Sequence, residues 1–330
     1  MTLPVSVLDL SPIGEGGDAA RSFANSTDLA QLAERLGFHR YWFAEHHNLQ
    51  GVASAATSVL MAHVAAHTKT IRIGAGGIML PNHAPLLIAE QFGTLESLHP
   101  GRIDLGLGRA PGGDPITAQA LRRTLHGSDQ SFPDDVVELI GYFATSTEAR
   151  PVRAVPGEGL KVPVWILGSS LFGAQMAAHY GLPYAFASHF APQALEQAVH
   201  VYRSTFKPSV HLDAPKVMMA CNVFAADTEE DAKYHYTSLQ QAFVNLRLGR
   251  PGKLPKPVDG LNLPPDYMAA LDAALKYSAV GTAQKVQEKL QSFIDHISPD
   301  ELIISSSIHD HAARRRSLEI TAEVREKLTP

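Results

Sequence analysis

Short runs rich in Val, Ile and Leu alternate along the chain with stretches whose apolar residues recur at helical spacing. The runs predict eight strands, at residues 6–12, 41–45, 70–81, 103–108, 162–168, 184–188, 217–225 and 301–308. Alternating strands and helices are typical of a parallel sheet. We therefore predict an α/β protein with a (β/α)8 TIM barrel. An open, doubly wound sheet stays as the alternative, because alternation alone does not show closure.

Two stretches interrupt the alternation. Residues 110–161 are long for one connection and contain a predicted helix over 134–143. Residues 249–281 contain five prolines and predict a long loop, of the kind that often forms a lid. Because no repeat or interdomain linker is visible, we predict one domain over residues 1–330 with these two insertions.

Composition narrows the function classes. The 330 residues carry 28 basic and 33 acidic side chains, so bulk charge predicts neither nucleic-acid nor membrane binding. The single cysteine, Cys221, excludes an intramolecular disulfide and a multi-cysteine metal cluster. No basic segment precedes the first apolar run, and residues 52–66, the most apolar helical stretch, are too short for a bilayer. We expect a cytoplasmic protein.

Two glycine-containing strand ends are candidates for anion binding. The segment GLGRAPGG, residues 106–113, resembles a dinucleotide loop but has Pro111 where a third glycine belongs. It leaves Arg109 among glycines, where an arginine can hold a phosphate or lie in solvent. Gly168, Ser169 and Ser170 end the fifth predicted strand before a helix, which suits a phosphate or an ordinary helix cap.

Histidines stand at two strand ends. Glu45-His46-His47 ends the second predicted strand, where barrel enzymes carry catalytic side chains, and imidazole suits proton transfer. His309-Asp310-His311 follows the eighth, where i,i+2 imidazoles are compatible with a metallohydrolase. Further ligands for that metal cannot be located, so we predict no metal site. The Arg314-Arg315-Arg316 run predicts a solvated helix face, because glutamates follow at pairing distance.

The order and spacing of five segments resemble the bacterial luciferase-like flavin-dependent monooxygenases. These segments are FAEHH, GAGGIMLPNHAP, AEQFGTLESLHPGR, IDLGLGRAPG and MAAHYGLP, and the resemblance covers nearly the whole chain. It implies a (β/α)8 barrel with an insertion, in agreement with the alternation. It also implies FMN, usually reduced and delivered by a separate reductase, or a deazaflavin analogue.

The resemblance assigns roles to particular residues. His46 matches the active-site histidine, and Gly76 and Gly77 match a pair often joined by a cis peptide beneath the flavin ring. Arg109 matches the arginine near the flavin phosphate, and Gly168, Ser169 and Ser170 match the phosphate loop. Gly108 stands where the luciferase α subunit has a reactive cysteine, which gives no support for light emission or thiol chemistry.

The implied activity is a monooxygenase reaction of reduced FMN and O₂ with a small organic substrate. The expected partners are that substrate, a flavin reductase and a second copy of the chain, since family members commonly pair through helices after the second and third strands. Residues 249–281 are a candidate for excluding water. A deazaflavin-dependent hydride-transfer enzyme, a non-catalytic flavin-binding protein and the metallohydrolase stay as alternatives.

Overall fold

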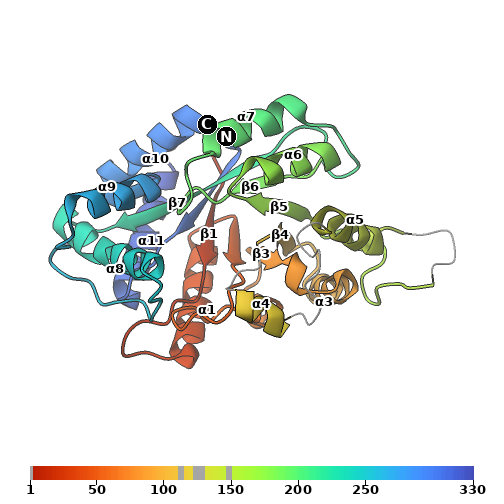
Figure 1. Cartoon of the computed structure of the whole chain (residues 1–330), viewed down its shortest axis with the longest axis horizontal. Helices are drawn as coiled ribbons and strands as arrows, with labels where there is room; N and C mark the ends of the chain where they lie inside the picture. The colour runs from red at the N-terminus through yellow and green to blue at the C-terminus, as the bar shows by residue number, and fades with distance from the viewer. Residues whose placement is uncertain (1–2, 111–114, 122–130, 146–150) are drawn as a thin grey trace.

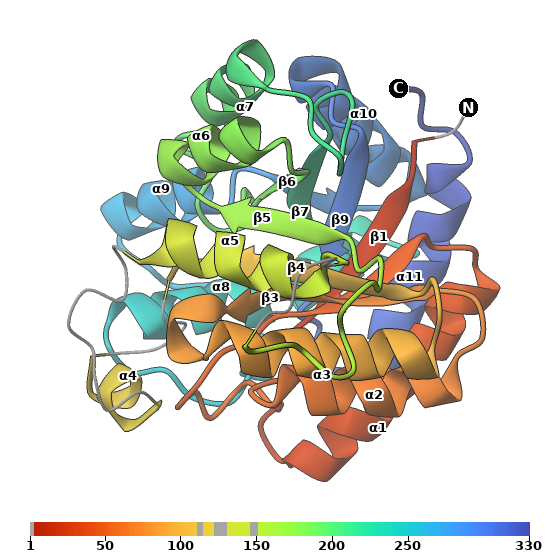
Figure 2. The same ribbon diagram turned by 90° about the vertical axis from the view of Figure 1, so that its right-hand side faces the viewer.

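A computed structural model describes residues 3–110, 115–121, 131–145 and 151–330. Eight parallel strands close into a barrel, as predicted (Figures 1 and 2). They are β1 (Val5–Asp9), β2 (Arg40–Phe43), β3 (Arg72–Met79), β4 (Ile103–Gly108), β5 (Val164–Gly168), β6 (Tyr184–Phe186), β7 (Val217–Ala225) and β9 (Glu301–Ser305). β9 pairs with both β1 and β7, and the pairing of β6 with β7 closes the ring, which excludes the open sheet.

Helices surround the barrel, and most of them come directly after a strand in the chain (Figure 2). They are α1 (Ala19–Arg35), α2 (Thr57–His67), α3 (Pro85–Leu98), α4 (Pro115–Leu121), α5 (Phe132–Phe143), α6 (Leu171–Tyr180), α7 (Leu195–Thr205), α8 (Glu229–Arg247), α9 (Pro265–Ala274), α10 (Ala283–Ile297) and α11 (His311–Arg325). A 3₁₀ turn, η1 (Leu80–Asn82), joins β3 to α3. Among the described helices, none has the length and apolar character that a bilayer crossing requires.

The prediction of a loop over 249–281 is wrong for its second half. Pro264 and Pro265 begin α9, where a proline at the first helical position loses no hydrogen bond. A ninth strand, β8 (Ser278–Gly281), then pairs with the outer half of β7 and lies outside the barrel. The sequence pattern did not predict β8, because a run of four residues after a proline-rich segment is too short to be recognised as a strand.

Several predicted strands end earlier in the structure than in the sequence pattern. The second ends at Phe43, so Glu45 and His46 lie in the segment after β2 rather than on it. The first ends at Asp9, where Ser11 adopts a positive φ of 48°. The predicted strands were too long because apolar residues continue along the chain after the hydrogen-bonded strand has ended.

Two apolar layers explain why the strands are hydrophobic on both faces. Tyr41 and Phe43 belong to the large core between the barrel and its helices. Trp42, between them, points into the barrel, where its ring meets Trp165 edge to face at 5.5 Å. Successive strand side chains point to opposite faces, so one strand serves both layers.

A buried ionic network fills the amino end of the barrel. Arg40 donates to Asp104 Oδ2 at 2.6 Å and to Glu301 Oε1 at 2.9 Å. Arg72 and the Trp42 indole also donate to Asp104, at 2.6 and 3.1 Å. Burial alone would raise the pKa of Asp104, but the two arginines lower it below its ordinary value. The network joins four strands at the end opposite the candidate site.

A second buried ion pair corrects the prediction for the arginine run. Arg314 is only 4% exposed and donates to Asp9 Oδ1 at 2.8 Å. Asp9 Oδ2 also accepts from Ser26 and Tyr41, each at 2.6 Å. Arg314 is therefore a core residue that ties α11 and α1 to β1, and only Arg316 of the run is largely exposed.

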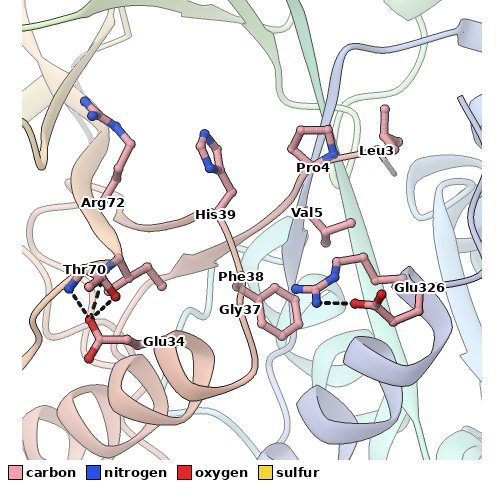
Figure 3. Close-up of a pocket in the computed structure, with 12 residues that line it drawn as sticks. Leu3, Pro4, Val5, Glu34, Gly37, Phe38, His39, Thr70, Arg72 and Glu326 are labelled. Carbon is pink, nitrogen blue, oxygen red and sulfur yellow. Dashed lines mark hydrogen bonds and ion pairs between the residues drawn. The ribbon is translucent and has the colours of Figure 1, made fainter. Parts of the chain in front are cut away.

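A pocket of about 450 Å³ opens at the amino end of the barrel (Figure 3). It lies beside the first residues of β1 and β3, among them Val5 and Arg72. Glu34 closes one side by accepting hydrogen bonds from the amides of residues 69–71. Barrel enzymes carry their chemistry at the other end, so this pocket is separate from the candidate site.

Candidate functional site at the carboxyl end of the barrel

The parallel barrel brings most of the sequence-predicted site residues to one end. Gly76 and Gly77 lie in β3, and Gly108 and Gly168 are the last residues of β4 and β5. His46 lies three residues beyond the end of β2. Because all the strands run in the same direction, their carboxyl ends surround one opening.

Glycines let the backbones of β3 and β4 approach closely. The Gly76–Gly77 peptide bond is cis, as predicted. A Cβ on Gly77 would lie 2.5 Å from the carbonyl oxygen of Gly106, and one on Gly76 would lie 2.8 Å from the Trp42 ring. The strand register shifts between Gly76 and Ile78. Larger residues would therefore force the two strands apart.

Gly108 is crowded by a side chain rather than by backbone. A Cβ there would lie 2.7 Å from Met79 Sδ. Any side chain at this position, a cysteine included, requires Met79 to move. Pro111, where a dinucleotide loop would have its third glycine, lies outside the described residues.

Arg109 lies next to the first turn of α6. Its guanidinium stands over the Phe172 ring, 4.2 Å from the centroid, and its side chain is exposed. Ser170 occupies the N-cap position of α6 without a side-chain cap hydrogen bond, so its hydroxyl is not used for an ordinary cap. Ser169 and Ser170 are both exposed. The structure thus brings together the two anion-binding candidates, which are 60 residues apart in sequence.

A Glu45-centred cluster links the segment after β2 to the turn after β3. His47 Nε2 lies 2.7 Å and His83 Nε2 2.9 Å from Glu45 Oε1. The Met79 amide donates to Oε2 at 3.0 Å, and Asn82 Nδ2 donates to Oε1 at 3.3 Å. The carboxylate is 1% exposed, whereas both imidazoles are partly exposed.

These donors keep Glu45 ionised. Burial on its own raises the pKa of a carboxyl group, because the charged form loses its hydration. The hydrogen bonds from His47 and His83, with that from the Met79 amide, outweigh burial and lower the pKa of Glu45 to about 2. The cluster therefore places a fixed negative charge beside His46.

A further histidine, His189, follows β6 at the same end of the barrel. Asn222 Nδ2 donates to its carbonyl oxygen at 2.7 Å, which fixes the backbone there. Burial, with a smaller electrostatic contribution from the nearby His46, lowers the pKa of His189 to about 4. Its buried Nδ1 has no hydrogen-bond partner among the residues that the structure describes. His189 is therefore a neutral imidazole close to His46.

Part of the 249–281 segment packs on the loops that follow β1 and β2. Leu254 forms a bridge with Gly14, and a Cβ on Gly51 would lie 2.4 Å from the Gly252 carbonyl oxygen. The Lys253 ammonium donates to the Gly17 carbonyl oxygen at 2.6 Å. The segment thus packs against the loops that extend from the carboxyl ends of β1 and β2.

The alternative metal site after the eighth barrel strand is not assembled. His309 Nε2 lies 3.1 Å from the Glu15 carbonyl oxygen, and His311 Nε2 lies 2.8 Å from Asp28 Oδ2. Asp310 caps α11. The residues of this motif have separate partners and do not converge on one point.

The sequence assigns no role to His83, Glu45 or His189. Glu45 stands in the Glu45-His46-His47 motif without a function of its own, and His83 lies inside a segment of the resemblance. Each of the three follows a barrel strand by two to four residues, at the end where catalytic side chains gather. Their positions just after predicted strands could have been noted from the sequence. The contacts among these residues could not, because they form only when the barrel brings the strand ends together.

Residues 3–326 match the model of the luciferase-like monooxygenase family. The chain belongs to this family. It is 53% identical to a luciferase-like monooxygenase of Escherichia coli K12 over 99% of this chain and 98% of the relative. It is 30% identical to the N-acetyl-S-alkylcysteine monooxygenase of Bacillus subtilis, over 97% of each chain. The crystal structure of apo-MsnO8 covers 99% of both chains with a TM-score of 0.88 and 33% identity.

More distant solved structures share the fold. One is the oxygenating constituent of 3,6-diketocamphane monooxygenase from Pseudomonas putida, in complex with FMN, with a TM-score of 0.75 and 19% identity. Another is an F420-dependent secondary alcohol dehydrogenase, with a TM-score of 0.70 and 14% identity. Both cover nearly the whole chain, and the two names describe different cofactors on one barrel.

Proposed function

We propose that this member of the family is a monooxygenase that uses reduced FMN and O₂ to oxygenate a small organic substrate. The observation that carries the proposal is the position of Arg109 beside Ser169 and Ser170 at the start of α6. A guanidinium, two exposed hydroxyls and a helix N-terminus form a donor set that suits a dianionic phosphate such as that of FMN. The FMN complex of a relative with the same fold supports the choice of cofactor.

The residues at the barrel end divide the remaining tasks. Bound in reduced form, FMN supplies the electrons for the reaction with O₂. Gly76 and Gly77 allow β3 to pack closely against Trp42 and β4, and we assign this pair to the floor beneath the flavin ring, with Gly108 and Gly168 at the neighbouring strand ends. His46 is the group we assign to proton transfer, because it follows β2 at the mouth, is the chain neighbour of the ionised Glu45 and is close enough to His189 to affect its pKa.

Arg109→Ala tests the cofactor assignment. A charge-assisted hydrogen bond contributes roughly 1.5–3 kcal/mol, so the variant should bind FMN about tenfold to a hundredfold more weakly. Riboflavin lacks the phosphate and should bind both proteins equally. Phe172→Leu is the matched control, because it removes the ring under the guanidinium but keeps the charge. Equal losses for FMN and riboflavin would mean that the phosphate lies elsewhere.

Turnover under ¹⁸O₂ tests the activity. The protein is supplied with reduced FMN and a panel of aldehydes, sulfonates, thioethers and aromatic heterocycles. One labelled oxygen atom in an organic product supports a monooxygenase. Product formed without O₂ from a reduced deazaflavin indicates hydride transfer, which the F420-dependent structural relative makes the second candidate. Flavin binding without any product indicates a non-catalytic protein.

A separate flavin reductase is the expected source of reduced FMN. The trigonelline monooxygenase of Acinetobacter baylyi, 23% identical over 81% of this chain, is named as an oxygenase component. We propose the same division of labour here. Turnover with NADH and FMN should require added reductase, and activity of the purified chain alone would contradict this.

We also propose a homodimer through α2 and α3, which lie side by side in Figure 2. Val59 of α2 and Leu87 and Leu98 of α3 are 69%, 48% and 63% exposed. Apolar side chains grouped on neighbouring helices are typical of a protein interface. Light scattering at micromolar concentration should give twice the chain mass of 35.6 kDa. A Leu87→Asp variant should shift the mass toward one chain.

A further inference from the structure

Three potential metal ligands converge at the carboxyl end of the barrel from two separate segments. Glu45 and His47 follow β2, and His83 follows the η1 turn after β3. One carboxylate oxygen of Glu45 and one ring nitrogen of each histidine lie within 4.8 Å of one another. His46 and His47 are adjacent in the sequence, but it is His47 and His83 whose ring nitrogens lie within 4.8 Å of each other.

Both oxygens of the Glu45 carboxylate have nitrogen neighbours. His47 Nε2 and Asn82 Nδ2 lie 2.7 and 3.3 Å from Oε1, and His83 Nε2 lies 2.9 Å from Oε1 and 3.0 Å from Oε2. These contacts hold a nitrogen of each imidazole at the carboxylate. A cation among these atoms would use the lone pairs of both imidazoles.

The spacing suits a small divalent ion. Zinc binds imidazole nitrogen at about 2.0–2.1 Å and carboxylate oxygen at about 2.0–2.2 Å, so tetrahedral ligand atoms lie roughly 3.3–3.5 Å apart. The two histidine nitrogens lie 2.7 and 2.9 Å from Oε1 and need to move outward by about 0.4–0.8 Å to reach that separation. The Met79 amide and His83 Nε2 each lie 3.0 Å from Oε2, and the amide hydrogen bond orients the carboxylate so that Oε1 lies near both imidazoles.

We propose that Glu45, His47 and His83 bind a divalent transition-metal ion of the Zn²⁺ type, with a fourth position open to solvent. Two imidazoles and one carboxylate are a donor set that zinc uses in proteins. The buried carboxylate supplies a negative charge, while the partly exposed imidazoles give an ion access from solvent. The bound ion would fasten the segment after β2 to the turn after β3. This inference does not depend on flavin binding.

The test uses the full chain without a polyhistidine tag, stripped with EDTA and then titrated with Co²⁺ and Zn²⁺. We expect one ion per chain with micromolar or tighter affinity, and a Co²⁺ visible spectrum of low coordination number. Zn²⁺ should displace Co²⁺. Bound metal should also raise the unfolding temperature by a few degrees, because it binds only the folded protein.

Two variants locate the site. His83→Gln and His47→Gln keep a hydrogen-bond donor for Glu45 but remove an imidazole ligand, so each should weaken Zn²⁺ binding at least tenfold. The control is His67→Gln, because His63 and His67 of α2 are stacked at 4.4 Å and form an alternative i,i+4 chelate. It should leave the affinity unchanged.

The proposal is overturned if wild type binds Zn²⁺ no more tightly than about 100 μM, or if bound Co²⁺ gives only the weak bands of the hexa-aqua ion. It is also overturned if binding is lost in His67→Gln and retained in the other two variants. Each variant is compared at equal folded fraction, and a variant that does not fold leaves the wild-type spectrum and the other variants to decide.

Discussion

At the amino end of the barrel, the buried carboxylate of Asp104 accepts hydrogen bonds from Arg40, Arg72 and Trp42. At the carboxyl end, the equally buried carboxylate of Glu45 is surrounded by imidazoles instead. An arginine stays charged at every accessible pH, whereas imidazole can lose its proton or bind a metal. The two carboxylates are buried to a similar degree. Asp104 at the amino end has partners that stay charged, whereas the partners of Glu45 at the carboxyl end can change protonation state or bind a metal.

The same contrast holds for the barrel interior along its axis. Rings of Trp42 and Trp165 fill the interior above the ionic network, and Gly74, the register partner of Trp42, leaves room for its indole. At the carboxyl end, β4 and β5 finish in Gly108 and Gly168, which carry no side chains. The barrel is therefore filled by aromatic rings near the amino end, whereas its strands end in small residues at the opening where a ligand is proposed to bind.

Asp104→Ala should have the largest effect on folding. It leaves Arg40 with one carboxylate partner in a buried position, and removing one side of a buried ion pair typically costs about 3–5 kcal/mol. The urea midpoint should fall accordingly, without a change in slope. Asp227→Ala, which breaks the exposed pair with Arg316, is the matched control and should leave the midpoint unchanged. Equal midpoints for the two variants would remove the structural role of the amino-end network.

His46→Ala, unlike Asp104→Ala, should reduce turnover and leave stability unchanged. Turnover should fall about a hundredfold or more, the usual contribution of general acid–base catalysis, while the urea midpoint stays within error of wild type. FMN affinity should change by no more than a few fold. His67→Ala, on the exposed face of α2, is the control for loss of an imidazole. Unchanged turnover with a verified substrate would exclude His46 from the chemistry.

The barrel itself could be predicted because each of its eight strands is a run of apolar, often β-branched residues. The ninth strand could not, since the four residues Ser278–Gly281 follow a proline-rich segment and pair only at the outer edge of β7. The arginine run was misread for a physical reason as well. Arg314 has glutamates nearby in sequence, but its partner Asp9 is 305 residues away and is found only when the barrel closes.

The candidate site was predicted one residue at a time. Arg109 and Ser170 each had an ordinary explanation when considered singly, and their proximity depends on β4 and β5 being neighbours in the barrel. The Glu45–His83 contact spans 38 residues and could not be read from local spacing. Resemblance named His46, whereas the surrounding charges that act on it come only from the fold.

Acid unfolding should separate the two ends by pH. His189, at the carboxyl end, has a folded pKa of about 4, below the ordinary histidine value, so the unfolded chain binds more protons between pH 6.5 and 4. Stability should fall by roughly 1–3 kcal/mol over this window as pH is lowered. His189→Asn should lose less over the same range. The lowered pKa of Asp104 makes the amino-end contribution disappear only below about pH 4, in both proteins. Identical pH profiles for wild type and His189→Asn would contradict the assignment.

The smallest effect is expected from Gly108→Ala, compared with Gly74→Ala nearer the amino-end network. A Cβ on Gly74 would lie 2.4 Å from the Trp42 indole nitrogen and 2.8 Å from Asp104 Cβ, both held in place by packing and hydrogen bonds. Such overpacking typically costs about 1–3 kcal/mol. On Gly108 the clash is with Met79 Sδ, in a flexible side chain that can change rotamer. We expect a loss below about 1 kcal/mol there, measured as the difference between the two urea midpoints. A Gly108→Ala variant as unstable as Gly74→Ala would mean that the carboxyl end is packed as tightly as the amino end.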